Sequence, residues 1–330
     1  MATIDCKLMA TIANSVLLRC SLAFNLIIAI CVIPVLVWAT WQLWSMKTSR
    51  LFHNNFKILI QIHLFGFFLH CSGRISLHSI DLFNYTVRDN PCDMVPNIYR
   101  CFVLRLIYNT GLWITNSTAL LLLIERWLAT SKSATYEQEP ARMGVWLAIL
   151  HFVIAAIPLA VLYSKFKFEG GVMYYCVTAQ ASLPYVGQIS VVVSLIFQFS
   201  AFLSFSYLHR HNKLIRKSNI HNSTLSDRYQ LEQNISSIAC LKHFANISTI
   251  FLGLFSSSYI ALMYYASSLE PYQYFALLEM NVAFPSYALV SIIMLSRTLK
   301  KNREQIEVNL AHHMNTPNHF YLDYFKQQIA

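Results

Sequence analysis

The stretch ALLLLIERWLAT, residues 119–130, places an acid and a base side by side at the end of an aliphatic run. A charge at the centre of a bilayer costs at least about 2.5 kcal/mol, whereas a charge at the membrane surface is tolerated and can bind a polar partner. Glu125 and Arg126 therefore mark a place where the chain leaves the hydrocarbon. Two roles remain open for Arg126. Its long side chain extends to a lipid phosphate, or its guanidinium takes part in a protein contact.

A second group of polar and aromatic residues lies further back in the same apolar run. Their spacing of three and four residues puts most of them, together with Leu112, on one face of a helix. A small-molecule site needs an aromatic lining with a few polar anchors, so this face is a candidate ligand pocket. The residues are Arg105, Tyr108, Asn109 and Trp113.

Glu279 is an acid within another apolar run, and an acid at that depth requires a partner. Pairing with Arg105 would supply one and would join Glu279 to the candidate pocket. The alternative is that Arg74 and Arg105 extend to the outer headgroups while Glu279 forms hydrogen bonds within its own segment. The sequence leaves both arrangements open.

Histidines raise the question of a metal site. His63 and His70 are seven residues apart, which is two helical turns, so they share one helix face. Zinc in an enzyme needs three converging protein ligands, and the other histidines lie in basic segments without a glutamate at ligand spacing. We therefore expect no metal, no cofactor and no enzyme activity. His63 and His70 are instead expected to be buried and hydrogen bonded.

Helices that cross a membrane must position these residues. Of the 330 residues, 56% are hydrophobic and 12% are charged, about half the charged share of a soluble domain. Lipid offers the backbone no hydrogen-bond partner, and the alternating pattern of β-barrel strands is missing, which favours helices. About 20 residues at 1.5 Å each cross a 30 Å hydrocarbon core. We predict an all-α membrane protein, a seven-transmembrane helix bundle in a single domain over 1–330, with helices near 20–44, 56–80, 98–127, 143–163, 185–208, 239–266 and 274–296.

Lysine and arginine indicate the orientation, because they concentrate in cytoplasmic loops. With the N-terminus outside, the cytoplasmic segments carry 17 of these residues and the outer segments carry six. We therefore predict an outer N-terminus and a cytoplasmic tail over 297–330. The net charge of +10 then belongs to a basic face beside anionic membrane lipid, and nucleic acid is not expected as a partner.

Four of the eight cysteines fall on the predicted outer side, where disulfides persist. A bond between Cys101 and Cys176 would tie the loop after the fourth helix over the mouth of the bundle. Cys6 and Cys92 would then form the second pair. Four cysteines allow three pairings, and the sequence does not choose between them.

One glycosylation sequon suits the predicted topology. Asn84, Tyr85 and Thr86 form an Asn-x-Thr sequence in a predicted outer loop, so Asn84 is expected to carry a glycan. The alternative is a sequon that stays unused because it lies close to the bilayer.

Glu125, Arg126 and Trp127 resemble the acid-arginine-aromatic triplet that closes helix three of rhodopsin-like receptors. Cys101 precedes Arg126 by 25 residues, as a disulfide cysteine does in that family. The resemblance implies that Arg126 is held by Glu125, and by an acid at the base of helix six, until it contacts a G protein. We hypothesise that Glu232 is that acid, on an amphipathic extension of helix six.

Other rhodopsin-like features are missing or altered. Helix two has no mid-helix aspartate, and NISTIFLGLFSSSY in helix six lacks the aromatic-x-proline motif. Helix seven reads NVAFPSYALV, in which Pro285 can produce a kink but Tyr287 follows it by two residues instead of three. The roles of the rhodopsin-like activation residues can therefore be assigned to this chain only in helix three.

The strings DLFNY, CDMVPNIYRCFVLRLIYN, LLIERWLAT and LSDRYQLEQN resemble the nematode serpentine chemoreceptors of the Sra superfamily, most closely the alpha/beta class. The resemblance covers nearly the whole chain. It implies a G protein-coupled receptor that binds a small odorant or pheromone in the outer half of the bundle and activates a heterotrimeric G protein. It also implies a multi-pass protein of the plasma membrane, in the cilia of sensory neurons.

Rival functions come from other seven-helix proteins. A ligand-gated ion channel is the main alternative, because insect odorant receptors have seven crossings, but they place the N-terminus inside. A transporter would need several buried charges and broken helices in matching halves. A membrane hydrolase would need the zinc ligands that the sequence lacks.

Overall fold

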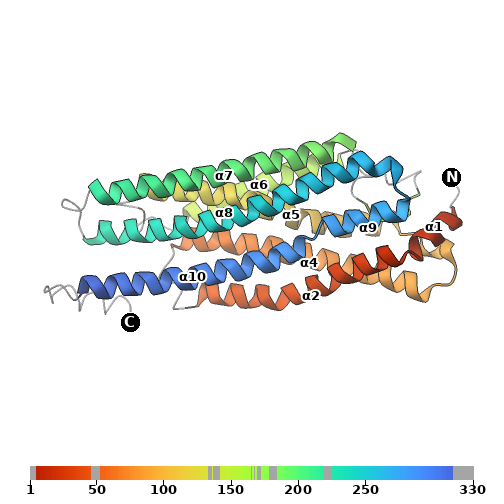
Figure 1. Cartoon of the computed structure of the whole chain (residues 1–330), viewed down its shortest axis with the longest axis horizontal. Helices are drawn as coiled ribbons and strands as arrows, with labels where there is room; N and C mark the ends of the chain where they lie inside the picture. Colours follow the sequence, from red (N-terminus) through yellow and green to blue (C-terminus); the bar gives the residue numbers. More distant parts are fainter. Residues whose placement is uncertain are drawn as a thin grey trace.

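The computed structural model describes residues 5–45, 53–132, 136, 142–164, 166, 168, 172–177, 184–218 and 225–314. Seven helical segments in this part of the chain are long and apolar enough to cross a membrane. They lie side by side along the length of the molecule (Figure 1). The predicted all-α, seven-transmembrane bundle is confirmed. The elements are α1 (Cys6–Ala13), α2 (Val16–Trp44), α4 (Asn54–Val87), η1 (Pro91–Met94), α5 (Ile98–Ser131), α6 (Arg142–Tyr163), α7 (Pro184–Ser218), α8 (Leu225–Tyr265), η4 (Ala266–Ser268), α9 (Pro271–Asn281) and α10 (Phe284–Met314).

Short polar side chains start several of these helices. Asp5, Ser15 and Asn97 accept hydrogen bonds from backbone N–H groups of the first turns of α1, α2 and α5. Such caps satisfy N–H groups that have no partner within the helix. They separate α1 from α2 and set the point at which the central helix α5 begins.

Several helices are longer than the apolar runs that predict them. α4 continues to Val87, and α8 begins at Leu225, well before residue 239. α10 continues through the predicted tail to Met314, while residues 315–330 of that tail lie outside the described residues. Polar sequence does not end a helix that is already propagating, so hydropathy alone underestimates these lengths.

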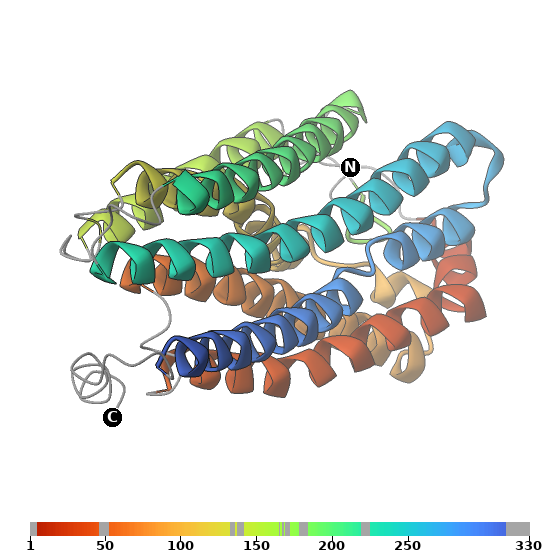
Figure 2. The ribbon, with the colours of Figure 1, turned by 60° about the vertical axis from the view of Figure 1, so that its left-hand side comes forward.

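The seventh crossing is divided into α9 and α10, with the break at Val282 and Ala283. Pro285 occupies the first turn of α10, where the missing N–H of proline costs no helical hydrogen bond. α2 anchors α9, because Asn25 donates to the carbonyl of Glu279 at 3.0 Å and Ser21 donates to that of Ala276 at 3.1 Å. Glu279 thus lies in the last turn of a short helix that is separate from α10. Figure 2 shows the break between the two helices.

The central helix α5 contacts α4, α6, α7 and α8. It packs closely against α4 where Gly111 faces Gly66. A Cβ on Gly111 would overlap the carbonyl oxygen of Gly66 and lie 2.5 Å from the backbone nitrogen of His70. Small residues allow such close backbone packing between transmembrane helices.

Buried histidines join α4 and α6 to α5. His63 Nδ1 lies 3.0 Å from the hydroxyl of Thr118, and His70 Nδ1 lies 3.2 Å from the carbonyl of Tyr108. His151 on α6 binds the carbonyl of Ile114 at 2.8 Å. The expectation that His63 and His70 are buried and hydrogen bonded is confirmed.

Two disulfides lie at the same end of the bundle. Cys6 is bonded to Cys92, and Cys101 is bonded to Cys176. The structure thus selects one of the three pairings that the sequence allows. We call this the disulfide end, and we call the opposite end, where α5 finishes, the Arg126 end.

Candidate functional site

At the Arg126 end, Arg126 and Glu125 form a buried pair within α5. The Nε and Nη2 atoms of Arg126 donate to the two carboxylate oxygens of Glu125. Glu125 is 0% exposed and Arg126 is 3% exposed, and the guanidinium also lies over the ring of Phe56. A bidentate pair of this kind is stronger and more directional than a single charged hydrogen bond. Arg126 therefore points into the protein, and the alternative that it extends to lipid phosphate is wrong.

Tyr136, in the segment after α5, covers the acid of this pair. Its hydroxyl donates to a carboxylate oxygen of Glu125 and accepts a hydrogen bond from the side-chain amide of Asn55 at 3.3 Å. Asn55 also accepts from the backbone N–H of Gly144 at 2.9 Å, which ties α4 to the start of α6. Burial first, and then the charge of Glu125, raises the pKa of the Tyr136 phenol above its ordinary value. The phenol is thus protonated and available as a donor at neutral pH.

An amide on α8 holds the other side of Arg126. Arg126 Nη1 donates to the side-chain oxygen of Asn234 at 3.2 Å. The amide nitrogen of Asn234 donates to Thr130 on α5 at 2.9 Å and to Asn212 on α7 at 3.0 Å, and Asn212 donates to Thr130 at 3.1 Å. This closed set of bonds joins the ends of α5, α7 and α8 around one guanidinium.

At the disulfide end, three helices bring their charges together at Glu279. Arg105 on α5 donates to one carboxylate oxygen of Glu279 at 2.5 Å, and Arg74 on α4 donates to the other at 3.3 Å. Both guanidiniums also lie over the ring of Tyr108, whose hydroxyl accepts from Arg74 at 3.0 Å. All three charged side chains are buried. An acid buried in this way is stable only with such direct partners.

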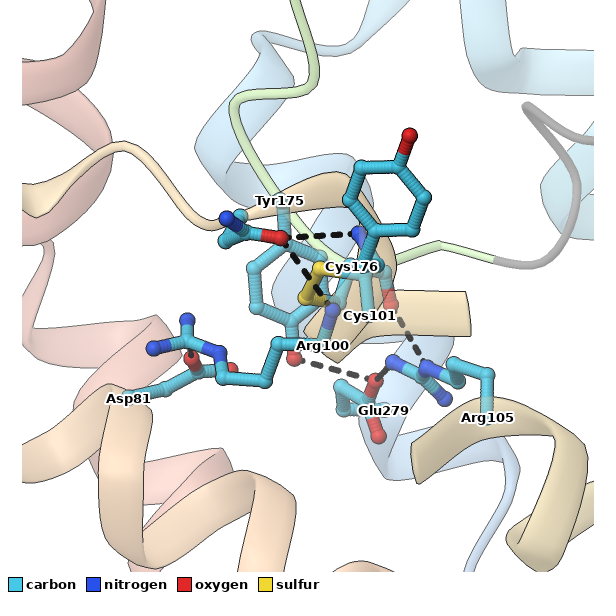
Figure 3. The surroundings of a disulfide bond; sticks show 9 residues. Asp81, Arg100, Cys101, Arg105, Tyr175, Cys176 and Glu279 are labelled. Carbon is cyan, nitrogen blue, oxygen red and sulfur yellow. Dashed lines mark hydrogen bonds and ion pairs between the residues drawn. A yellow bond between two sulfur atoms is a disulfide. The ribbon is translucent and has the colours of Figure 1, made fainter. Parts of the chain in front are cut away.

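The segment held by the Cys101–Cys176 disulfide covers this cluster (Figure 3). Tyr175 donates its hydroxyl to Glu279 at 3.0 Å, and the carbonyl of Cys176 accepts from Arg105 Nε at 2.6 Å. Beside the cluster, Asp81 and Arg100 form a separate ion pair at 3.5 Å. The disulfide therefore fixes two of the groups that position Arg105 and Glu279.

A small cavity lies between the two charged sites. It is enclosed by residues of α5, α7, α8 and α10, and the side-chain nitrogen of Gln198 in its wall has no hydrogen-bond partner among the described residues. Tyr287, just after the helix break, shares a hydrogen bond of 2.5 Å with Ser248 at the same cavity. The lining residues are Thr115, Asn116, Gln198, Phe244, Ser248, Phe251, Leu252 and Tyr287.

The family described as "Serpentine type 7TM GPCR receptor class ab chemoreceptor" matches residues 3–330. The chain belongs to this family of serpentine receptors. It is therefore a multi-pass membrane protein of a seven-transmembrane, chemosensory G protein-coupled receptor family, and the family consists of receptors, not enzymes. The predicted resemblance to the alpha/beta class is confirmed.

Three curated relatives of this serpentine receptor come from Caenorhabditis elegans. Serpentine receptor class alpha/beta-14 is 26% identical over 223 residues, which are 66% of this chain and 57% of that protein. Serpentine receptor class alpha-39 is 23% identical over 77% of this chain and 68% of its own length. Serpentine receptor class beta-17 is 23% identical over 78% of this chain and 72% of its own length. The match to the alpha/beta relative thus spans less than two thirds of that protein.

The candidate pocket of the serpentine receptor is assembled in part as the sequence predicts. The Arg105–Glu279 pair is present, and the alternative in which both arginines extend to headgroups is wrong, because Arg74 and Arg105 both bind Glu279. Asn109 instead donates to Tyr163 on α6 at 2.7 Å. Trp113 packs with residues of α4 and α6, away from the charges. The predicted face of α5 is therefore divided between neighbouring helices.

The hypothesis that Glu232 pairs with Arg126 in the serpentine receptor is wrong. Glu232 binds Arg216 on α7 at 2.9 Å, and both side chains are exposed. Residues two apart on a helix lie about 200° apart, so the register that turns Asn234 toward Arg126 turns Glu232 away. Trp127 is 55% exposed on the outside of the bundle, whereas the side chain of Arg126 contacts Glu125, Asn234 and Phe56.

The loop position predicted for Asn84 is also wrong. Asn84 lies within α4, which continues to Val87, and only 6% of its surface is exposed. A glycan needs an accessible asparagine on a surface loop. The position of Asn84 in this receptor therefore gives no support to the predicted glycosylation.

Sequence reasoning did not assign roles to Tyr136, Asn234 or Tyr175. Asn234 lies two residues after Glu232 and therefore on the opposite face of the same helix, and this spacing is the signal that could have identified it. Tyr136 and Tyr175 lie between helices, where hydrophobic periodicity does not indicate which way a side chain points.

Proposed function

We propose that this chain is a chemosensory receptor that binds a small environmental chemical at the disulfide end and activates a heterotrimeric G protein at the Arg126 end. The observation that carries the proposal is the enclosure of Arg126 by Glu125, Tyr136 and Asn234. Arg126 is held by groups at the ends of several helices, so it can be released only if those helices move. A contact that can be closed or opened by helix movement is what a switch requires.

The ligand is proposed to bind near Arg105, Tyr108 and Glu279. Polar anchors and aromatic rings converge there from α4, α5 and α9, and the segment containing Tyr175 covers them. Convergent polar groups in an apolar and aromatic surrounding are typical of small-molecule sites. Asn109 and Trp113 belong to the support of α5 against α6 in this proposal.

Movement of α9 and α10 is the proposed connection between the two sites. Glu279 lies in the last turn of α9, and the break before Pro285 separates this short helix from α10. A ligand that changes the contacts of Glu279 would shift α9 at the break, and α10 contacts both α2 and α8. α8 carries Asn234, so a shift of α8 would open the contacts of Arg126.

The disulfide end is proposed to face the environment. Both disulfides lie at this end, and disulfides persist in oxidising surroundings. The distribution of lysine and arginine supports the same orientation. The receptor then resides in the plasma membrane, and the family resemblance suggests the ciliary membrane of sensory neurons.

An epitope tag before residue 1 tests the orientation. Antibody should bind the tag on intact cells that express the full chain, and a tag after residue 330 should be reached only after permeabilisation. The reverse result would overturn the orientation and would favour the rival proposal of a ligand-gated ion channel.

The signalling role is tested in cells that express the receptor and are screened with odorant mixtures, using calcium and cyclic nucleotides as readouts. Arg126→Ala should abolish the response at equal surface expression, because the variant lacks the group proposed to bind the G protein. Lys213→Ala, an exposed basic residue of α7 at the same end, is the matched control and should respond normally. A full response from Arg126→Ala would refute G protein coupling through this residue.

A further inference from the structure

The charges at the disulfide end do not balance. Arg74 and Arg105 carry two positive charges, and Glu279 supplies one negative charge to both. Asp81 does not restore the balance, because Arg100 lies 3.5 Å from it and the two charges cancel. His78, at 3.6 Å from Glu279, has no negative charge in either protonation state. One positive charge of the cluster is thus left over in the interior, where an uncompensated charge is costly.

Unpaired donors accompany this surplus charge. The Nε and Nη1 atoms of Arg74 are buried and have no hydrogen-bond partner among the described residues. Arg74 is 0% exposed, so water does not solvate these N–H groups. Both nitrogens of His78, one turn further along α4, also lack a hydrogen-bond partner in the described part of the chain. Buried charged donors of this kind normally have partners, and a missing partner points to a group that binds there.

An anion with a single negative charge would balance the surplus positive charge and would accept a hydrogen bond from an unpaired donor. A carboxylate oxygen can accept a hydrogen bond from a free N–H group of Arg74, and charge-assisted hydrogen bonds of this type are strong. The aromatic rings of Tyr108, Tyr175 and Phe275, which stacks on Tyr175, provide an apolar surrounding for the rest of an organic molecule. An inorganic anion would bind the positive charge but would make no apolar contact with these aromatic rings.

We propose that the chemical recognised by this receptor is an organic acid whose carboxylate binds Arg74 beside Glu279, so that two carboxylates face two arginines. This inference rests on the proposed function, because it names the ligand class of the same site. The free N–H groups of Arg74 have no exposed surface, so the acid enters only as α9 or the segment at Tyr175 moves. Entry of the ligand is therefore coupled to movement of α9 or of the segment that contains Tyr175.

Thermal unfolding of the purified full-length receptor in lipid nanodiscs tests the ligand class without any signalling readout. Hexanoate, benzoate and phenylacetate are titrated in chloride-free buffer, next to the corresponding primary amides and next to sodium chloride. At least one carboxylate should raise the Tm at concentrations at which its amide and chloride do not. Equal shifts from the amide, or from chloride, would overturn the proposal in favour of a neutral ligand or an inorganic anion only.

Two substitutions should move the carboxylate affinity in opposite directions. Arg74→Gln removes the surplus charge and the free donors, so the concentration for a half-maximal Tm shift should rise about tenfold or more. Glu279→Gln increases the surplus, so that concentration should fall. Arg74→Lys keeps the charge and serves where Arg74→Gln fails to fold. If neither the wild type nor Glu279→Gln is stabilised by any carboxylate, the cluster is not an anion site and the proposal fails.

The two proposals fail in different ways. A receptor that signals through Arg126 to a neutral odorant and binds no carboxylate refutes the acid ligand and leaves the receptor function standing. If a carboxylate binds in a way that depends on Arg74 but cells give no signal through Arg126, the acid ligand stands and the G protein coupling is refuted.

Discussion

Arg126 donates two hydrogen bonds to the carboxylate of Glu125, its neighbour in the sequence. Adjacent residues on a helix point about 100° apart, so both side chains must curl toward each other along the end of α5 to form this contact. The acid is then covered by Tyr136 and the base by Asn234. The pair thus depends on groups contributed by two other parts of the chain, and each of them can be removed separately.

Tyr136→Phe removes the hydroxyl that donates to Glu125 and keeps the ring. A hydrogen bond to a charged group contributes about 1.5–3 kcal/mol, so the closed contact should weaken and basal signalling should rise about tenfold. Cyclic-nucleotide and calcium levels without added odorant measure the effect. Tyr207→Phe, an exposed tyrosine of α7, is the control. Unchanged basal signalling in Tyr136→Phe at equal surface expression would show that the hydroxyl does not restrain Arg126.

Asn234→Ala and Glu232→Ala should differ although the two residues are two apart. Asn234→Ala removes the contacts of α8 with Arg126, Thr130 and Asn212, so it should raise basal signalling. Glu232→Ala removes only an exposed ion pair with Arg216, which contributes at most about 1 kcal/mol, so it should not. Basal activity without ligand, normalised to surface expression, is the measurement. The opposite ranking would restore Glu232 as the partner of Arg126 in the functioning receptor.

Asn234→Asp should act in the other direction. It places a carboxylate 3.2 Å from Arg126 Nη1, where the amide oxygen lies in the structure. The substitution also removes the hydrogen bonds that Asn234 donates to Thr130 and Asn212, and the attraction between two charges should outweigh this loss, stabilise the closed contact and lower both basal and odorant-evoked signalling. Dose-response curves against the wild type measure this change, and a variant as active as the wild type would argue against the contact as a restraint.

Gly111→Ala should destabilise the bundle, because its Cβ would meet the backbone of α4 at Gly66 and His70. Overpacking of this kind costs about 1–3 kcal/mol or more, and the Tm of the purified receptor should fall. Gly253→Ala on α8 is the matched control, because a Cβ there meets nothing within 4 Å. Alanine is preferred to glycine in a helix, so the control should leave the Tm unchanged or raise it. Equal Tm values for the two variants would contradict the close packing of α4 and α5.

The two disulfides predict the peptides that remain joined after proteolysis under non-reducing conditions. Mass spectrometry should find Cys6 linked to Cys92 and Cys101 linked to Cys176. Replacing Cys101 and Cys176 together by serine should lower the stability by about 2–5 kcal/mol and weaken ligand responses, because the loop that contacts Arg105 and Glu279 loses its attachment. The same treatment of Cys6 and Cys92 should affect stability more than ligand response. A Cys6–Cys101 or Cys6–Cys176 peptide would refute the pairing.

The sequence by itself determined the class of the molecule and the places where its charges lie. In lipid, the backbone N–H and C=O groups of the seven apolar runs can form their hydrogen bonds only if the runs are helices. Glu125 and Arg126 stand out because charged residues are rare in such runs. The same scarcity marked Arg105 and Glu279 as possible partners, since a buried acid must find a base, but it left open the alternative in which Arg74 and Arg105 extend to the headgroups. These conclusions follow from local composition and need no knowledge of how the helices pack.

Only the tertiary structure decided which groups meet. The rotation of α8 about its axis turned Asn234 to Arg126 and Glu232 to Arg216, and hydropathy contains little information about rotation when both faces of a helix are polar near its end. The packing of α4 against α5 added Arg74 to the Arg105–Glu279 pair and buried Asn84, which a loop would have exposed. The pairing of the four cysteines depended in the same way on how α1 and the segment after α6 fold back over the bundle. Each of these outcomes is set by contacts between residues far apart in the chain, and for that reason the order of the residues alone did not specify them.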